Sequence, residues 1–366
     1  MASESEKAAA RLVVVGFGGD QIPASLRGLL ELGVSGVVLF AKNIPDPANI
    51  RELTGALKAS RAQKLLLCVD QEGGRVARLR GEFTPVPSMR MIGAAKTAED
   101  LAYHAGVVLG AETRWAGFDV DFAPVVDVDS NPANPVIADR SFGADVNQVC
   151  ALAARLIPAM QSRGVAACAK HFPGHGDTAQ DSHHDLPRLA HDLARLERIE
   201  LPPFRAAIGA GVASVMSAHV VFEPLDARFP ATMSPPALGG ILRDRFKFDG
   251  VVFSDDLEMK ALANHFPLEE QLLRGSAAGL DLFTICHSEE LQRSAISILA
   301  GAIDRGLIPA ERVKSSLRRI DSLTARFAGG VGTGTLADVQ ASVRPSIDAL
   351  KSVGAYAPTK DPTKFK

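Results

Sequence analysis

The chain has 366 residues, of which 46% are hydrophobic and 22% charged, and its formal net charge is -2. This composition is typical of a globular protein with a large apolar core. The near-neutral charge provides no positive footprint for nucleic acid or an acidic membrane surface, so neither is expected as a partner. No apolar run approaches the roughly 20 residues that span a bilayer. The N-terminal residues read MASESEKAAA and lack the apolar core of a secretory signal, which predicts a cytoplasmic protein.

Short apolar segments alternate with longer amphipathic segments along the chain. Several of the apolar segments are rich in valine and nearly continuous, which is typical of parallel strands buried on both faces. They cover residues 12–19, 34–41, 65–70, 118–127, 165–171, 213–221, 250–256 and 279–286. Helix-like segments between them cover residues 47–62, 97–115, 145–163, 189–210, 235–246 and 288–305. This alternation predicts a single α/β barrel of the (β/α)8 TIM type rather than an open doubly wound sheet.

The end of the chain differs in character from the barrel. A further helix is expected over residues 309–328, with Pro309 in its first turn. From Gly329 the sequence becomes polar and contains glycine, proline and lysine. We therefore expect a catalytic barrel over residues 1–328 and a loosely ordered polar tail over residues 329–366. The pattern gives no indication of the oligomeric state.

Charged or titratable side chains follow nearly every expected strand. Barrel enzymes place their catalytic groups at the C-terminal ends of the strands, so these side chains should gather at one mouth. They include Lys42, Asn43, Asp70, Glu72, Arg75, Asp127, Asp139, Arg140, Lys170, His171, His175, His219, Asp255, Asp256 and His287. Solvated loop charges would explain any one of them but not the set.

The segment that follows the fifth strand carries two pairs of polar residues. Lys170 and His171 come directly after the strand, where they are expected to bind a polar substrate. Asp181 and His183 are separated by one residue, so in an extended segment they point to the same side. The carboxylate can then fix the tautomer of the imidazole and raise its basicity, which suits a general acid/base. The alternative is a charge cluster at the start of a helix.

Asp255 and Asp256 end the seventh expected strand. A carboxylate in this place can act as a nucleophile, a base or a metal ligand. Strand alternation puts the two side chains on opposite sides, so only one is expected to face the substrate. The other is expected to be a structural partner that caps a helix beginning at Leu257.

These residues resemble glycoside hydrolase family 3, and in particular its bacterial β-N-acetylhexosaminidase branch. The matching segments occur in the order of the family and span most of the barrel. They are VDQEGGRV (69–76), FAPVVDV (122–128), DRSFG (139–143), KHFPGHGDT (170–178), DSHHDLP (181–187) and SDDLEM (254–259). The KHFPGHG element followed by DSH is the most specific of them.

The resemblance implies a retaining mechanism in two steps. Asp255 matches the nucleophile that forms a glycosyl-enzyme intermediate, and His183 matches the acid/base, held by Asp181. Most retaining glycosidases use a second carboxylate in that role. A neutral histidine does not repel an anionic acceptor, so phosphorolysis stays open beside hydrolysis. The family's sugar-binding roles carry over to Asp70, Arg78, Arg140, Lys170 and His171, with Arg140 near the N-acetyl group.

The resemblance also implies a substrate. The usual substrate of this branch is GlcNAc β-linked to an anhydro-muramic acid that carries a peptide, which is cleaved in the cytoplasm during peptidoglycan recycling. A small carbohydrate or muropeptide substrate and no cofactor are therefore expected. In one departure, Ala138 stands where many relatives have glycine before Asp-Arg-Ser. If that glycine requires a positive φ, the local turn should differ here, without loss of activity.

Three alternatives remain beside this interpretation. A metal-dependent barrel hydrolase could use zinc ligands among His171, His175, His183, His184 and Asp255, but no H-x-H follows the first strand, so no metal is expected. A family 3 β-glucosidase would usually take its acid/base from a second domain. An inactive sugar-binding barrel would have no use for both a nucleophile and an acid/base pair.

Overall fold

The fold is a closed barrel of eight parallel strands in a computed structural model that describes residues 2–46, 49–179 and 185–354. The strands follow one another around the barrel in the order β1-β10-β9-β7-β5-β4-β3-β2. They are β1 (Val13–Val15), β2 (Gly36–Leu39), β3 (Leu66–Val69), β4 (Val120–Asp121), β5 (Ala166–Phe172), β7 (Ser214–Ser217), β9 (Val251–Asp256) and β10 (Leu282–Ile285). All eight expected strands and the TIM-type barrel are therefore confirmed.

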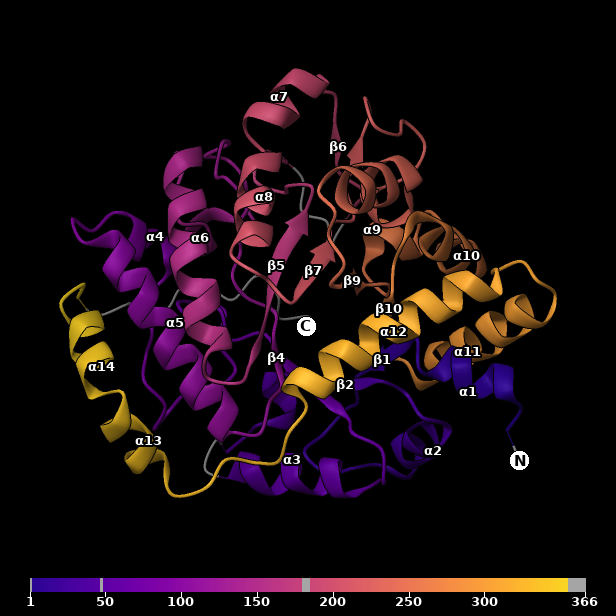
Figure 1. Cartoon of the computed structure of the whole chain (residues 1–366), viewed down its shortest axis with the longest axis horizontal. Helices are drawn as coiled ribbons and strands as arrows, with labels where there is room; N and C mark the ends of the chain where they lie inside the picture. Colours follow the sequence, from indigo (N-terminus) through magenta and orange to yellow (C-terminus); the bar gives the residue numbers. More distant parts are fainter. Residues whose placement is uncertain (1, 47–48, 180–184, 355–366) are drawn as a thin grey trace.

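Helices surround the barrel, as Figure 1 shows. The α-helices are α1 (Glu4–Ala10), α2 (Ala24–Leu32), α3 (Ile50–Ala59), α4 (Met89–Gly93), α5 (Ala98–Trp115), α6 (Val146–Gln161), α7 (Leu193–Arg198), α8 (Leu201–Gly209), α9 (Lys260–Ala263), α10 (Leu268–Ala278), α11 (Glu289–Asp304), α12 (Ala310–Phe327), α13 (Leu336–Ser342) and α14 (Arg344–Lys351). Short 3-10 helices are η1 (Ala41–Asn43), η3 (Ala138–Arg140) and η4 (Ala231–Met233), and η5 (Pro236–Arg245) is a π-helix. Two-residue strands β6 (Arg188–Leu189) and β8 (Val221–Phe222) pair beside the barrel.

Burial on both faces explains why the strands are apolar. Every residue of β1, β3 and β5 is buried, including the three consecutive valines of β1. The barrel closes where β1 pairs with β10 on one side and with β2 on the other. Since all of these pairings are parallel, the C-terminal ends of the strands meet at one mouth, and side chains that follow the strands are brought together there.

The helices differ from the expectation in several places. The segment expected as one helix over residues 189–210 forms α7 and α8, because Pro202 begins a new first turn where its missing N–H is not needed. Helices α2 and α10 were not predicted. Helix α1 was not predicted either, although Ser3 and Glu6 form a reciprocal capping box at its start.

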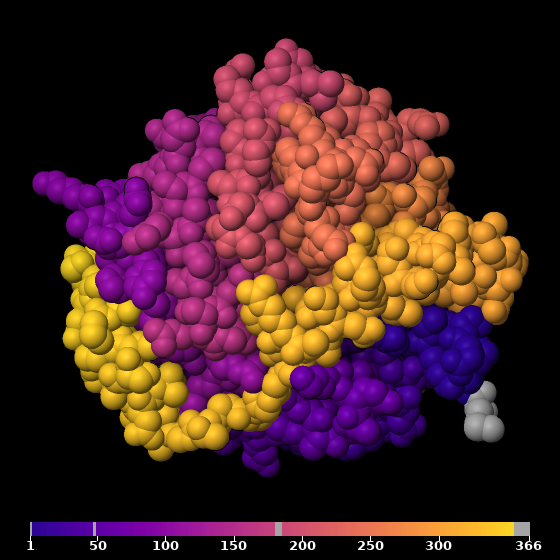
Figure 2. All heavy atoms as spheres, in the orientation of Figure 1, coloured from indigo at the N-terminus to yellow at the C-terminus, as the bar shows by residue number. Residues whose placement is uncertain are grey.

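The C-terminal segment crosses the N-terminal end of the barrel and continues as two helices. Figure 2 shows it as a band, orange to yellow, that runs over the surface from α12 to α14. Helices α13 and α14 pack against α5. The expectation of a loosely ordered tail is therefore wrong for residues 336–351, where buried Leu336, Ile347 and Leu350 face the rest of the protein. Within the described ranges, no helix is long and apolar enough to cross a membrane.

Candidate active site

A cavity lies at the mouth of the barrel. Apolar side chains from inside the barrel, Val38, Phe122 and Met216, form part of its wall. Seven acidic, basic or imidazole side chains at or after the strand ends share that wall: Asp70, Arg140, Lys170, His171, His175, Asp255 and Asp256. The structure thus brings together, around one cavity, side chains from distant parts of the sequence.

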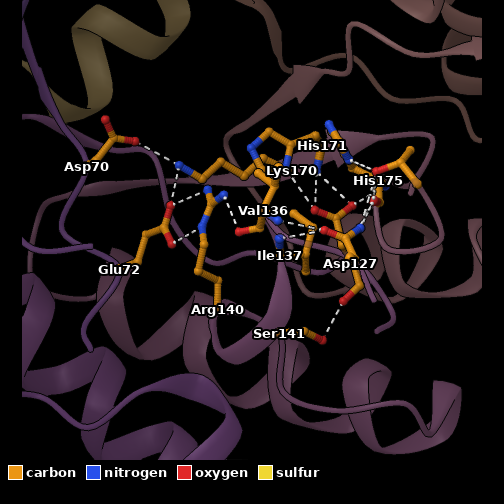
Figure 3. A network of polar contacts seen from close by, with 12 residues as sticks. Asp70, Glu72, Asp127, Val136, Ile137, Arg140, Ser141, Lys170, His171 and His175 are labelled. Atoms are coloured by element: carbon orange, nitrogen blue, oxygen red, sulfur yellow. Dashed lines mark hydrogen bonds and ion pairs between the residues drawn. The ribbon is translucent and has the colours of Figure 1, made fainter. Parts of the chain in front are cut away.

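Four of the charged groups at the mouth form one ion-paired network (Figure 3). Lys170 Nζ lies 2.8 Å from Asp70 Oδ1 and 2.7 Å from Glu72 Oε1. Glu72 also accepts two hydrogen bonds from Arg140, from Nε at 2.9 Å and from Nη2 at 2.8 Å. This bidentate arrangement fixes the plane of the guanidinium, so Arg140 presents its charge to the cavity in one orientation.

The network keeps its members charged in spite of their burial. Burial alone would raise the pKa of Glu72, but Arg140 and Lys170 lower it below its usual range. Burial likewise opposes the charge of Lys170, yet Asp70 and Glu72 raise its pKa above the ordinary value. A ligand that enters the cavity therefore meets fixed charges rather than groups that titrate near neutral pH. Glu72 was not assigned a role from the sequence, although it belongs to the VDQEGGRV segment.

Arg78 reaches the network through Asp70. Its side chain is buried, and Nη2 lies 3.4 Å from Asp70 Oδ2. Its backbone N–H donates to Gln71 Oε1 at 2.8 Å. The structure therefore places Arg78 as a support for Asp70, whereas Asp70, Arg140, Lys170 and His171 of the expected sugar-binding set line the cavity.

A second network orients two histidines from the segment after β5. Asp127 Oδ2 lies 2.8 Å from His171 Nδ1, and Asp127 Oδ1 accepts the backbone N–H groups of His171 and His175 at 3.1 and 2.7 Å. Burial alone would raise the pKa of Asp127, but His171 and these hydrogen bonds lower it. Because Asp127 is ionised, His171 Nδ1 carries the donated proton, and Nε2 is left for a ligand in the cavity.

Burial keeps His175 neutral. It lowers the pKa of this imidazole to about 4, and His175 Nδ1 lies 2.9 Å from Thr178 Oγ1. His175 also lines the cavity. The sequence places His175 and Asp127 at the mouth but does not predict these contacts, because they run between two loops rather than along one strand.

Asp255 and Asp256 both line the cavity. The expectation that only one of them faces the site is therefore wrong. Strict alternation ends here because β9 ends at Asp256 and its pairing with β10 shifts register beside it. Asp256 Oδ1 accepts the backbone N–H groups of Glu258 and Cys286, so its expected structural role is present. The expected helix cap is not, since α9 begins at Lys260.

The nucleophile candidate is held by its neighbour. Asp255 Oδ1 accepts the backbone N–H of Asp256 at 2.8 Å. This hydrogen bond restrains the carboxylate through Oδ1. A carboxylate restrained through one oxygen presents the other in a defined direction.

The turn before Arg140 contains the residue that departs from the family pattern. Ala138 has φ +41, so it adopts the left-handed conformation itself. The expectation that the turn should differ is therefore wrong, and the alanine carries a conformation that favours glycine.

The expected acid/base pair, Asp181 and His183, lies outside the described residues. Asp177, which precedes the pair, accepts a hydrogen bond from Ser130 Oγ at 2.9 Å and pairs with Arg195 Nη2 at 3.0 Å. Among the described residues no group of three or more histidine, cysteine, aspartate or glutamate side chains is arranged to hold a metal ion.

Comparisons with known proteins identify the family. The glycosyl hydrolase family 3 N terminal domain matches residues 8–323. A curated β-hexosaminidase of Thiobacillus denitrificans is 42% identical over 278 residues, which cover 75% of this chain and 77% of that protein. A β-hexosaminidase of Pseudomonas aeruginosa is 39% identical over 288 residues, or 78% of this chain and 86% of that protein.

Solved structures agree with these relatives. A glycoside hydrolase family 3 β-N-acetylglucosaminidase from Paenibacillus sp. str. FPU-7 superposes with a TM-score of 0.90 and 37% identity, covering 96% of this chain and 69% of that one. NagZ from Neisseria gonorrhoeae, in complex with N-trifluoroacetyl-D-glucosamine, superposes with a TM-score of 0.76 and 30% identity, covering 94% and 98%. The chain belongs to glycosyl hydrolase family 3. Within this family its similarity is to the β-hexosaminidases, which confirms the branch expected from the sequence and identifies the chain as a glycoside hydrolase.

Proposed function

We propose that this protein is a retaining β-N-acetylglucosaminidase that removes a non-reducing terminal β-linked GlcNAc. The observation that carries the proposal is the carboxylate of Asp255 on the wall of the cavity that also holds Asp70 and Lys170. A sugar held by the charged network would place its anomeric carbon within reach of this carboxylate. The likeness to a NagZ solved with a GlcNAc derivative supports the choice of sugar.

The first chemical step transfers the sugar to Asp255. Oδ2 attacks the anomeric carbon and forms an ester bond while the glycosidic C–O bond breaks. The leaving oxygen takes a proton from the imidazolium of His183, which Asp181 orients, so the aglycone departs as a neutral alcohol. The bond between Asp255 Oδ1 and the Asp256 N–H holds the carboxylate in place during the attack.

The second step releases the sugar. His183, now neutral, takes a proton from a water molecule as the water oxygen attacks the anomeric carbon. The ester bond to Asp255 breaks and its carboxylate is regenerated, while His183 regains the proton that it gave up in the first step. Two displacements at the same carbon give net retention of configuration.

The ion-paired network supplies recognition rather than chemistry. Lys170 donates and Asp70 accepts at fixed positions, which suits the vicinal hydroxyls of a pyranose. Arg140, held in plane by Glu72, is placed to donate to the acyl oxygen of the N-acetyl group. Preformed charges of this kind avoid the cost of ordering side chains when the sugar binds.

We further propose that the natural substrate is GlcNAc linked to an anhydro-muramic acid, with or without its peptide, and that cleavage takes place in the cytoplasm during peptidoglycan recycling. This choice is supported by the resemblance to the bacterial branch of the family. An anionic aglycone of this kind would leave the cavity through the open mouth of the barrel.

The experiment that tests the proposal compares aryl β-GlcNAc with aryl β-glucoside, each with and without phosphate, and identifies the product. The proposal expects cleavage of the N-acetylated substrate to free GlcNAc in both conditions. Preference for the glucoside would point to a β-glucosidase. GlcNAc 1-phosphate as the main product would replace hydrolysis with phosphorolysis.

The acid/base role of His183 has a separate test. His183→Ala should reduce turnover of substrates with poor leaving groups by about 100-fold or more, because the departing oxygen then lacks a proton donor. Activated aryl substrates should lose far less. Kinetics across a series of leaving groups measure this difference, and equal losses for all of them would contradict the assignment.

A further inference from the structure

His219 is a buried histidine for which the mechanism above has no role. It follows β7 and is 1% exposed. Its Nε2 lies 3.0 Å from the carbonyl oxygen of Asp256, and its Nδ1 lies 2.8 Å from Thr232 Oγ1. A carbonyl oxygen only accepts, so Nε2 carries the proton and donates to Asp256.

The other ring nitrogen is fixed by hydroxyl groups. Burial lowers the pKa of His219, although Asp255 and Asp256 oppose this, so the ring is neutral and its unprotonated Nδ1 faces Thr232 Oγ1. The Ala218 carbonyl oxygen, 3.0 Å from Thr232 Oγ1, is a second acceptor for the one hydroxyl proton of Thr232. Thr232 Oγ1 lies 3.0 Å from Ser217 Oγ. The tautomer and the plane of the imidazole are therefore set by buried partners.

Asp256 connects His219 to the nucleophile. The N–H of Asp256 holds Asp255 Oδ1 at 2.8 Å, and its carbonyl accepts from His219 Nε2 and from the Met259 N–H at 3.0 Å each. The hydrogen bond from Met259 closes a turn over residues 256–259. Because both of its partners belong to that turn, it does not fix the position of the turn in the barrel. The bond from His219 comes from a different barrel strand, so it fixes that turn relative to the barrel.

We propose that His219 is a positioning residue that sets the direction of the nucleophile. His219 holds the carbonyl of Asp256, and the N–H of the same residue restrains Asp255 Oδ1. Fixing the backbone of Asp256 therefore fixes the carboxylate of Asp255, so that Oδ2 faces the anomeric carbon. The inference rests on the proposed function, in which Asp255 is the nucleophile. His219 takes and gives no proton in this role.

The role predicts an effect on the chemical steps and not on sugar binding. A nucleophile displaced by about 1 Å can lose on the order of 100-fold in rate. The groups proposed to bind the sugar follow β3, β4 and β5, and the ion pairs that join Asp70, Glu72, Arg140 and Lys170 do not include His219. Loss of the His219 hydrogen bond should therefore lower kcat while the inhibition constant for GlcNAc stays near that of the wild type.

The test compares two replacements of similar size. His219→Gln keeps an amide N–H near the position of Nε2, whereas His219→Met removes the donor. With aryl β-GlcNAc, His219→Met should lose about 10- to 100-fold in kcat, and His219→Gln should recover most of it. A fluorinated N-acetylglucosaminyl fluoride that traps the glycosyl-enzyme should label Asp255 more slowly in His219→Met by the same factor.

Two outcomes would overturn the role. Wild-type kcat in His219→Met would show that the hydrogen bond does not position Asp255. Equal losses in both variants, with a parallel fall in Tm or a weaker affinity for GlcNAc, would show a structural role alone. If His219→Met fails to fold, Thr232→Val removes the hydroxyl that contacts Nδ1 instead and should lower kcat in the same direction by a smaller factor; an unchanged kcat would overturn the role.

Failure of the proposed function itself looks different. In that case the wild type would not cleave aryl β-GlcNAc, or Asp255→Ala would turn it over normally. A wild type that cleaves the substrate through Asp255, with kcat unaffected by His219→Met, would leave the proposed function in place and reject only the role of His219.

Discussion

The two ends of the barrel hold buried carboxylates in similar contacts but differ in what lies over them. At the N-terminal end, Asp281 precedes β10 and is 0% exposed. It pairs with Arg243, with Arg312 and Arg319 of α12, and accepts from Ser316 Oγ at 2.7 Å. Helix α12 therefore covers a buried carboxylate that helps to fasten it to the barrel.

A second carboxylate at the same end repeats the arrangement. Asp119 precedes β4, and its Oδ1 lies 2.7 Å from Lys58 Nζ and 2.9 Å from Arg114 Nη1. It also accepts the backbone N–H of Gly329 at 3.1 Å. The segment after α12 is thus held by a carboxylate that precedes a strand, in the same way as α12 itself.

At the mouth of the barrel, similar ion pairs between carboxylates and cations lie beside a cavity. Asp70 and Glu72 pair with Lys170 and Arg140, as Asp281 and Asp119 pair with their cations, but a cavity lies beside them. Ion pairs covered by a helix hold the fold together, whereas ion pairs that line a cavity hold their charges ready for a ligand. This difference predicts opposite consequences for substitutions at the two ends.

The largest expected effect is at the mouth. Asp255→Ala should lower kcat on aryl β-GlcNAc by at least about 1000-fold, because the proposed nucleophile is lost. Thermal unfolding should change little, since this end of the barrel is built for a ligand. Near-normal turnover would reject the nucleophile assignment.

The next largest effect is at the N-terminal end. Asp281→Asn should reduce the free energy of unfolding by about 2 to 4 kcal/mol, because three arginines lose their shared carboxylate. Turnover by the folded enzyme should be preserved. Urea denaturation measures the stability and steady-state kinetics measure kcat. A loss of activity without a loss of stability would contradict the structural role given to the N-terminal end of the barrel.

The pH dependence of the free energy of unfolding distinguishes the buried carboxylate of Glu72 at the mouth from exposed carboxylates on the surface. The pKa of Glu72 is lower than usual in the folded protein, since Arg140 and Lys170 outweigh the effect of burial. Such a carboxyl adds stability above its unfolded pKa, and that stability is lost as the pH falls below it. The free energy of unfolding of the wild type should therefore decline below about pH 4.5, and Glu72→Gln should flatten this decline.

The matched control for this titration is Glu99→Gln, at the exposed start of α5. Unfolding curves across the acidic range should have the same slope in this variant as in the wild type. An unchanged slope in Glu72→Gln as well would mean that the ion-paired network does not contribute to acid stability.

The smallest expected effect is at Ala138. A left-handed conformation costs an L-residue about 1 to 2 kcal/mol, while glycine makes the unfolded chain more flexible by roughly 0.4 to 1 kcal/mol. Ala138→Gly should therefore raise the free energy of unfolding by up to about 1 kcal/mol, with kcat within twofold of the wild type. A decrease in stability on chemical denaturation would show that Ala138 is not strained.

The barrel could be predicted from the sequence because its strands are buried on both faces. Burial of this kind requires nearly continuous apolar segments, and the three valines of β1 are an example. The two C-terminal helices could not be predicted in the same way. Helix α14 carries Pro345 in its first turn and buries only one narrow face, so its sequence resembles a polar tail.

Side chains that follow strands could be placed at the mouth, but their partners could not. Asp70, Lys170 and Arg140 lie where barrel topology requires, around one cavity. The bridge that Glu72 forms between two of them depends on the path of a loop after β3. The shared exposure of Asp255 and Asp256 depends on where β9 stops alternating, and a sequence pattern does not fix either feature.

The closure of the barrel has a consequence for the synthesis of the chain. β1 pairs with β10 from Val13 with Phe283 to Val15 with Ile285, so the first strand to leave the ribosome waits for the last. At roughly 5 to 20 residues per second that delay is on the order of tens of seconds. During this time β1 has an unpaired edge, which is a template for wrong pairing. A nascent chain that stalls before β10 would therefore be a target for chaperones or aggregation, whatever the stability of the finished enzyme.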